Sequence, residues 1–148
     1  MRDPKLSLRT AYYQLLNGAL TYNAVTIPVS DDLLNLASSS ALQYVILSTQ
    51  SSQDTSTFSS FDTREDIIID IVSKAQSRLS KTVVDSIASQ IMNLVLPNPG
   101  QNGLPSQANF VFQNVQKIAD RYIDLQLNSS TTVVRRLLTF TQTVRQTS

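Results

Sequence analysis

The sequence contains neither cysteine nor histidine. Without cysteine the chain cannot form disulfides, supply a thiolate nucleophile or build the usual structural zinc sites. Without histidine it lacks the most frequent general acid–base residue and the commonest metal ligand. An enzyme would have to work with aspartate, lysine, tyrosine, serine and the single glutamate, Glu65. We therefore expect a protein that is not an enzyme and that uses no cofactor and no metal.

Long hydrophobic runs and an excess of one charge are also missing. No apolar run approaches the ~20 residues of a membrane-spanning helix, and no hydrophobic signal segment follows the N-terminal Met-Arg-Asp-Pro. We expect no membrane segment and folding in the cytoplasm. The 12 basic and 11 acidic residues nearly cancel, and the one basic cluster, Arg135 and Arg136 with Arg145, is too small to track a phosphate backbone. The 148 residues, 41% of them hydrophobic, suffice for a single domain, 1–148.

Two segments have the spacing of amphipathic helices. The first begins at Asp3 and Pro4, a capping residue followed by proline at the first helical position, and ends before Gly18. The second covers Ser80–Leu96 and is ended by Pro97. Its apolar positions recur every three or four residues: Val83, Val84, Ile87, Ala88, Ile91, Leu94 and Val95.

Five segments favour strands because they alternate or are rich in β-branched residues: Ala24–Ser30, Leu42–Gln50, Arg64–Lys74, Val115–Leu127 and Thr132–Gln146. Pro28 places the first of them at a sheet edge. A helical interpretation of Val115–Leu127 stays open, because "IADRYIDLQL" also tolerates a helical period. Asp31–Ser40 is either a helical turn or a loop, and residues 51–63 are either a strand extension or a hairpin loop. Pro97–Ala108 is a loop by its prolines and glycines, either a plain connector or a contact arm.

The resulting order of elements is α-β-β-β-α-β-β. Consecutive strands with short connections favour antiparallel pairing, and amphipathic helices need a sheet to cover. We therefore predict an α+β fold, an antiparallel β-sheet with two helices packed on one face. Its last two strands form a long C-terminal β-hairpin.

The strand "REDIIIDIVSK" carries clustered carboxylates that could in principle form a metal or acid–base site. Strand alternation puts Ile67, Ile69 and Ile71 on the face toward the helices, and Asp66 and Asp70 on the other. Four residues separate the two aspartates by about 13 Å, too far for a shared proton or a common metal ion. We therefore predict that they face solvent or a neighbouring subunit.

Arg135 and Arg136 lie on opposite faces of the last strand, so one of them must point toward the helices or lie near an end. Either arginine could pair within its own chain or form an intersubunit salt bridge. We predict Asp66, Asp70, Arg135 and Arg136 as subunit-interface residues.

Several stretches, in this order, resemble the tail-completion or tail-terminator proteins of tailed bacteriophages. They are "LRTAYYQLLNGAL", "VTIPVSD", "YVILSTQSSQDTSTFSSFDTREDIIIDIVSK", "VVDSIASQIMNLVL" and "RRLLTFTQTV", which together cover most of the chain. The family often has a proline before its "YVIL"-like strand, where this chain has Gln43.

The resemblance implies a structural protein of the virion, made in the cytoplasm of a bacterial host. It implies a homo-oligomeric ring, six-fold or twelve-fold, at the head–tail junction. Its partners would be the portal or connector adaptor and tail proteins, with DNA passing through the lumen without sequence-specific binding. A tail terminator, a head-completion adaptor and a ring in a short-tailed virus all fit this pattern.

Two functions from other classes remain. One is a soluble, non-viral binding module whose long hairpin pairs with a strand of its partner. The other is a carboxylate-based metal-binding enzyme, which would need a further carboxylate, such as Asp120 or Asp124, beside Asp66 and Asp70.

Overall fold

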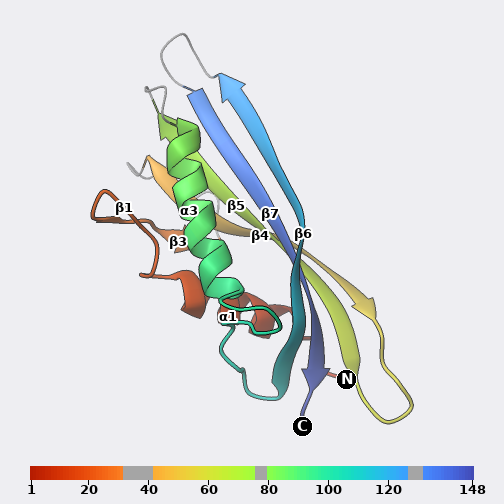
Figure 1. The fold of residues 1–148 in the computed structure, drawn as a ribbon. Helices are drawn as coiled ribbons and strands as arrows, with labels where there is room; N and C mark the ends of the chain where they lie inside the picture. Colours follow the sequence, from red (N-terminus) through yellow and green to blue (C-terminus); the bar gives the residue numbers. More distant parts are fainter. Residues whose placement is uncertain (32–41, 76–79, 127–131) are drawn as a thin grey trace.

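Helices and strands form two layers in the computed structural model, which describes residues 1–31, 42–75, 80–126 and 132–148. The elements are α1 (Lys5–Leu16), β1 (Thr21–Tyr22), β2 (Val25–Thr26), β3 (Val29–Ser30), β4 (Gln43–Asp54), β5 (Asp62–Ala75), α3 (Ser80–Val95), β6 (Phe110–Gln126) and β7 (Thr132–Gln146). In the described part of the chain, α1 and α3 lie on one face of a five-stranded sheet (Figure 1). The predicted α+β fold, with its C-terminal hairpin β6–β7, is confirmed.

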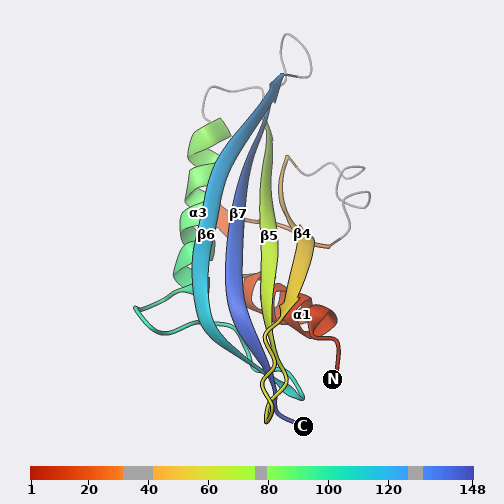
Figure 2. The same ribbon diagram turned by 90° about the vertical axis from the view of Figure 1, so that its right-hand side faces the viewer.

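The main sheet has the strand order β3-β4-β5-β7-β6, and its long strands lie side by side in Figure 2. The pairs β4–β5, β5–β7 and β7–β6 are antiparallel. The short strand β3 runs parallel to β4 and pairs only with Val45 and Ile46. The sheet is therefore antiparallel except at this edge.

The predicted strand Ala24–Ser30 is wrong in its extent, because the chain turns within it. Strands β1 and β2 form a separate two-stranded hairpin. Between them Asn23 and Ala24 have φ angles of 49° and 62°, the left-handed conformation that a tight hairpin turn needs at both central positions. Only Val29–Ser30 joins the main sheet, at the edge position that Pro28 predicts.

The other predicted segments keep their type and change mainly in length. Helix α1 ends before Gly18, whose φ is +78°, and the Asp3 carboxylate accepts a hydrogen bond from the Lys5 amide (3.0 Å). Residues 51–54 extend β4, while 55–61 form the loop of the β4–β5 hairpin, so both readings of residues 51–63 hold in part. Asp31–Ser40, expected as a turn or loop, lies outside the described residues beyond Asp31.

The main core lies between the helices and the sheet face that they cover, which we call the helix-side face. Ile67, Ile69 and Ile71 of β5 are fully buried there, as alternation predicts. Other members of this core are Leu8, Tyr12 and Leu16 of α1, Val84, Ile87 and Ile91 of α3, and Leu138 and Phe140 of β7. Burial of this apolar stripe is the main force that holds the helices on the sheet.

Strand β6 spans 17 residues and confirms the strand interpretation of Val115–Leu127 as far as Gln126, the last described residue of this segment; over these residues the helical alternative is wrong. Two irregularities interrupt its pairing with β7, the first between Gln113 and Gln116, where Asn114 has a φ of 54°. The loop 96–109, which precedes β6, is held against the end of α3. The Gly103 amide donates to the Val95 carbonyl (3.0 Å), and a Cβ at Gly103 would lie 2.0 Å from the carbonyl oxygen of Leu94.

Candidate interaction surface

Asp70 and Arg135 meet on the outer face of the sheet, the face opposite the helices. Asp70 pairs with Leu137 and Val72 with Arg135, so the two charged residues are diagonal neighbours. The Arg135 Nε lies 3.3 and 3.2 Å from the two carboxylate oxygens, and Nη2 lies 2.5 Å from Oδ2. This hydrogen-bonded carboxylate raises the pKa of Arg135. The cation that meets Asp70 therefore belongs to the same chain.

A small apolar cluster surrounds this ion pair on the outer face. It consists of Tyr44, Ile46, Val72 and Val133, each less than 10% exposed. The Asp70 side chain is only 5% exposed, while that of Arg135 is 40% exposed. Apolar side chains thus cover part of the outer face. The Arg135 guanidinium is the member of the ion pair that is exposed to solvent.

Arg136 points the other way, toward α3, and joins the helix to the edge strand. Its Nε and Nη2 donate to the two carboxylate oxygens of Asp120 at 2.8 and 2.7 Å. Its Nη1 donates to Asp85 at 2.9 Å, and its guanidinium carbon lies 5.2 Å from the centre of the Tyr122 ring. The Tyr122 hydroxyl donates to the same Asp85 carboxylate at 2.5 Å. Arg136 lowers the pKa of Asp120 to about 2, with Lys117 adding to the effect.

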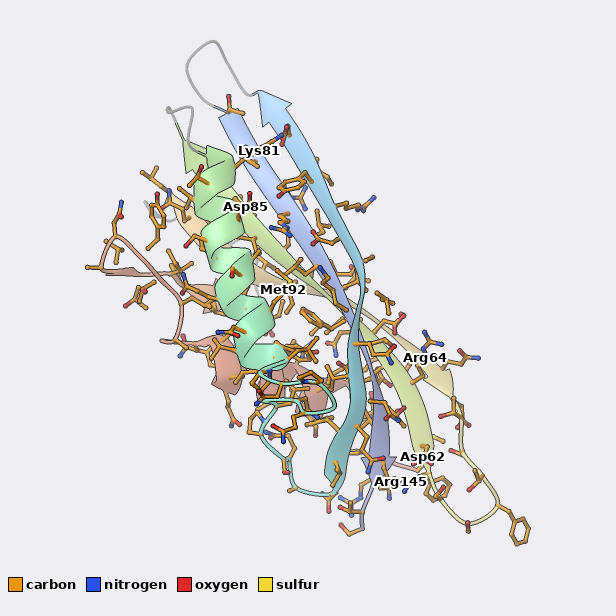
Figure 3. All side chains as sticks on the ribbon, in the orientation of Figure 1. Asp62, Arg64, Lys81, Asp85, Met92 and Arg145 are labelled. Carbon is orange, nitrogen blue, oxygen red and sulfur yellow. The ribbon has the colours of Figure 1, made fainter. Side chains whose placement is uncertain are left out.

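The first turns of α3 therefore contact β6 through charged groups rather than through apolar packing. Figure 3 shows Lys81 and Asp85 on this end of the helix, with Met92 further along. Lys81 forms a second ion pair with Asp124 of β6 at 3.3 Å, and its ammonium lies 5.4 Å from the centre of the Tyr122 ring. These ion pairs attach residues 120–124 of β6 and Arg136 of β7 to the first turns of α3.

Asp66 occupies a different environment from Asp70, although both lie on the outer face of β5. Its Oδ1 atom is buried and has no hydrogen-bond partner among the described residues. It borders a hollow of ≈ 330 Å³ that is also lined by Ser51, Ser52 and Gln53 of β4 and by Arg64. The Nε of Arg64 donates instead to the Thr141 hydroxyl (3.2 Å). The carboxylate that borders this hollow thus has one buried oxygen without a partner among the described residues, one strand in from the sheet edge.

Glu65 is the buried charged group that the sequence reasoning missed. It shares the helix-side face with the isoleucines and is 0% exposed, so this face is not uniformly apolar. The Ser52 hydroxyl donates to its Oε1, whereas Oε2 has no partner among the described residues. Burial raises the pKa of Glu65. Its parity with Ile67 was the signal that could have placed it inside.

A buried hydrogen-bond chain lies beside Glu65 and connects α1 to the centre of the sheet. The Tyr12 hydroxyl donates to Gln142 Oε1 at 2.7 Å, and Gln142 Nε2 donates to the Glu65 carbonyl at 2.7 Å. The Tyr12 ring also packs against Phe140, with 6.1 Å between ring centres. This chain fixes the helix relative to β5 and β7 by directional bonds as well as by apolar burial.

The β4–β5 hairpin carries exposed aromatic residues at its loop, close to both chain ends in Figure 1. Phe58 is fully exposed and Phe61 is 48% exposed. Asp62 begins β5 and forms a two-point ion pair with Arg145 of β7, at 2.9 and 3.1 Å (Figure 3). This pair fixes the base of the hairpin, so that its apolar residues project from a rigid end of the sheet.

The predicted interface residues therefore occupy three separate places. Asp70 and Arg135 form one ion pair, Arg136 lies on the opposite face, and Asp66 lies apart from all three. Among the described residues no three acidic, histidine or cysteine side chains are grouped closely enough to hold a metal ion. No helix in the described part of the chain is long and apolar enough to cross a membrane.

The described residues form an α+β fold with two helices on one face of a mixed five-stranded sheet. One solved structure with this fold is a chain in the virion of a native gene transfer agent (GTA) particle. The two chains superpose with a TM-score of 0.68, at 18% sequence identity, over 93% of this chain and 94% of that one. At this identity the likeness shows the shared fold. No protein-family model matches the sequence, and no curated protein sequence matches it.

Proposed function

We propose that this chain is a structural protein of a virion and forms a homo-oligomeric ring, six-fold or twelve-fold, at the head–tail interface. The observation that carries the proposal is the fold that it shares with a GTA virion chain over nearly the whole length of both proteins. A match that covers nearly all of both chains favours a similar role for the whole protein, rather than the reuse of a small motif. The ring would join the tail to the connector and let DNA pass through its lumen.

The sequence resemblance supports the same role independently of that match. The stretches similar to tail-completion proteins cover most of α1, the β4–β5 hairpin, α3 and β7. They therefore include the elements that build the core, and the resemblance is not confined to one local motif. In such a ring the partners are the portal or connector adaptor on one side and tail proteins on the other.

The chemistry of the charged residues favours a structural role over catalysis. Asp62, Asp70 and Asp120 are each bound by an arginine, through two hydrogen bonds or more. The oxygens of carboxylates held in this way are already occupied by an arginine, which leaves them poorly placed to bind a metal ion or to act on a substrate. The near-zero net charge of +1 suits a lumen that neither grips nor strongly repels DNA.

The test is the mass of the purified protein by native mass spectrometry, together with negative-stain images of the same sample. We expect a closed assembly of six or twelve copies with a central opening, and the same protein in purified particles of its virus. A protein that stays monomeric at every concentration and is absent from particles would refute the proposal. Added divalent cations should leave its melting temperature unchanged, whereas a metal-binding enzyme predicts an increase.

A second candidate is a protein-binding module that pairs its edge strand with a strand of another protein. The long edge strand β6 favours it, since an unpaired strand edge is a template for β-augmentation. This candidate predicts a monomer that takes up one copy of a different protein. The ring proposal instead predicts self-assembly of the pure chain, so one mass measurement separates the two.

A further inference from the structure

Both edges of the main sheet are open in the described part of the chain, and they differ in character. On one side β6 pairs only with β7, which leaves an edge of 17 residues, about 55 Å long. On the other side β3 covers only Val45 and Ile46, so that residues 48–54 of β4 have β5 as their only strand neighbour. The Gln50 side chain in this segment also forms hydrogen bonds with Arg9 and with the Lys5 carbonyl of α1. Neither edge contains proline, the residue that cannot donate to a ladder, but each of the two strands has an irregularity in its existing pairing.

The hollow beside the open part of β4 is bordered by a carboxylate that lacks a hydrogen-bond partner among the described residues. Asp66 pairs in register with Ser51, and its buried Oδ1 lacks a hydrogen bond among the described residues. A strand added next to β4 would lie two strand spacings, about 10 Å, from β5. Because Ser51 is small, a long basic side chain from that strand can lean over it into the hollow and reach Asp66.

The open edge of β6 offers a matching cation. Arg121 pairs in register with Leu137, which places it on the outer face, the same face as Asp66. It is exposed, and no hydrogen bond or ion pair links it to another described residue. The other charged residues of β6, namely Lys117, Asp120 and Asp124, lie on the helix-side face and have partners there.

We propose that β6 of one copy pairs with the open part of β4 in the next copy, and that Arg121 of the first contacts Asp66 of the second. The inference rests on the proposed ring and names the contact that closes it. Strands β4 and β6 run in opposite directions within the sheet, so a ring with its axis along the strands makes this pairing antiparallel. Such a head-to-tail contact pairs the open part of β4 with part of β6 at every junction once the ring closes.

The register of the sheet agrees with this contact. Arg121 pairs with Leu137, and Leu137 pairs with Asp70, so Arg121 and Asp70 lie at the same height along the strands. Asp70 is four residues, or about 13 Å, along β5 from Asp66. Four strands, β4, β5, β7 and β6, separate one contact from the next, a width of about 19 Å. Bringing Arg121 level with Asp66 of the neighbour then requires strands inclined by about 35° to the ring axis. This is within the range of closed β-sheets.

Charge reversal tests the contact through the mass of the assembly. Asp66→Arg and Arg121→Asp each place like charges at every junction, so we expect both single variants to lose the ring. The double variant Asp66→Arg/Arg121→Asp restores an opposite pair at every junction and should recover it. Arg2→Asp, the same change at an exposed position beside Thr63 and Val144 on the helix side of the sheet, is the matched control and should assemble normally. Rings that survive both single variants would overturn the pairing.

Hydrogen exchange of the unmodified protein gives a second measure that does not depend on the variants folding. Dilution from ring to monomer should speed amide exchange in residues 48–54 and 118–124, because the pairing hydrogen bonds are lost. Equal exchange at these two segments in both states would refute the contact while leaving the ring intact. If the unmodified chain forms no ring at all, the proposed function fails first, so the two failures are distinguishable.

Discussion

Tyr12→Phe removes a single hydroxyl from the core and tests whether the buried hydrogen-bond chain stabilises the fold. The hydroxyl donates to Gln142 Oε1 at 2.7 Å, and the two residues are 0% and 1% exposed. Phenylalanine keeps the ring that packs against Phe140, so the packing changes little. What is lost is one hydrogen bond, and what is left is a buried amide oxygen without a donor.

The expected loss of stability follows from the Gln142 Oε1 atom, which is left without a hydrogen-bond donor. A buried polar atom left without its partner costs about 1–3 kcal/mol, and the relief from burying one hydroxyl fewer offsets part of it. We expect Tyr12→Phe to lower the free energy of unfolding by about 1–2 kcal/mol. With a urea dependence of about 2 kcal/mol per molar, the unfolding midpoint should fall by about 0.5–1 M.

Urea unfolding followed by circular dichroism measures this midpoint, at one protein concentration for all variants because assembly raises apparent stability. The neighbouring Tyr13→Phe is the matched control, since Tyr13 is 42% exposed and should lose almost nothing. In a Gln142→Met background, Tyr12→Phe should cost clearly less, because the acceptor is already gone. Equal midpoints for Tyr12→Phe and the unmodified protein would refute the reasoning.

Three further predictions concern titration and packing. Burial raises the pKa of Glu65 above 4.5, so stability should fall as the pH rises from about 4.5 through the folded-state pKa; Glu65→Gln should remove that slope in thermal melts. Arg136 lowers the pKa of Asp120 to about 2, so its stabilisation is present above the unfolded value of 3.8 and is lost as the pH falls toward about 2. Asp120→Asn should therefore flatten the acid side of the melting profile. Ile69→Ala should cost about 2–5 kcal/mol in urea unfolding, whereas Ile118→Ala, at a position 45% exposed, should cost far less.

Strand parity was the part of the fold that the sequence predicted best. Alternation alone put Ile67, Ile69 and Ile71 in the core and placed Arg135 and Arg136 on opposite faces, and both predictions are confirmed. The reason is geometric, since side-chain direction in a strand is set by the residue's own position. Periodicity likewise identified both helices, because their buried stripes repeat at a helical spacing.

The partners across strands could not be predicted, because they depend on register. Asp70 meets Arg135 only because β5 and β7 pair with Asp70 opposite Leu137. The bulges in β4 and β6 shift the register further, and no local residue pattern announced them. Glu65 was missed for another reason: a lone charged residue beside a charged neighbour looks like the solvated end of a strand.

The hydrogen bonds that join β5 to β4 and to β7 affect how the protein responds to a pulling force. This strand is paired with β7 from Asp62 to Ala75 and with β4 over much of the same length. Antiparallel hydrogen bonds lie perpendicular to their strands. A pull along the strand axis therefore loads all of them together, whereas a pull across the sheet breaks them one after another from an end. We therefore expect the protein to resist force along its strands better than force across its sheet, so that it carries tension best when the tension runs lengthwise through β5.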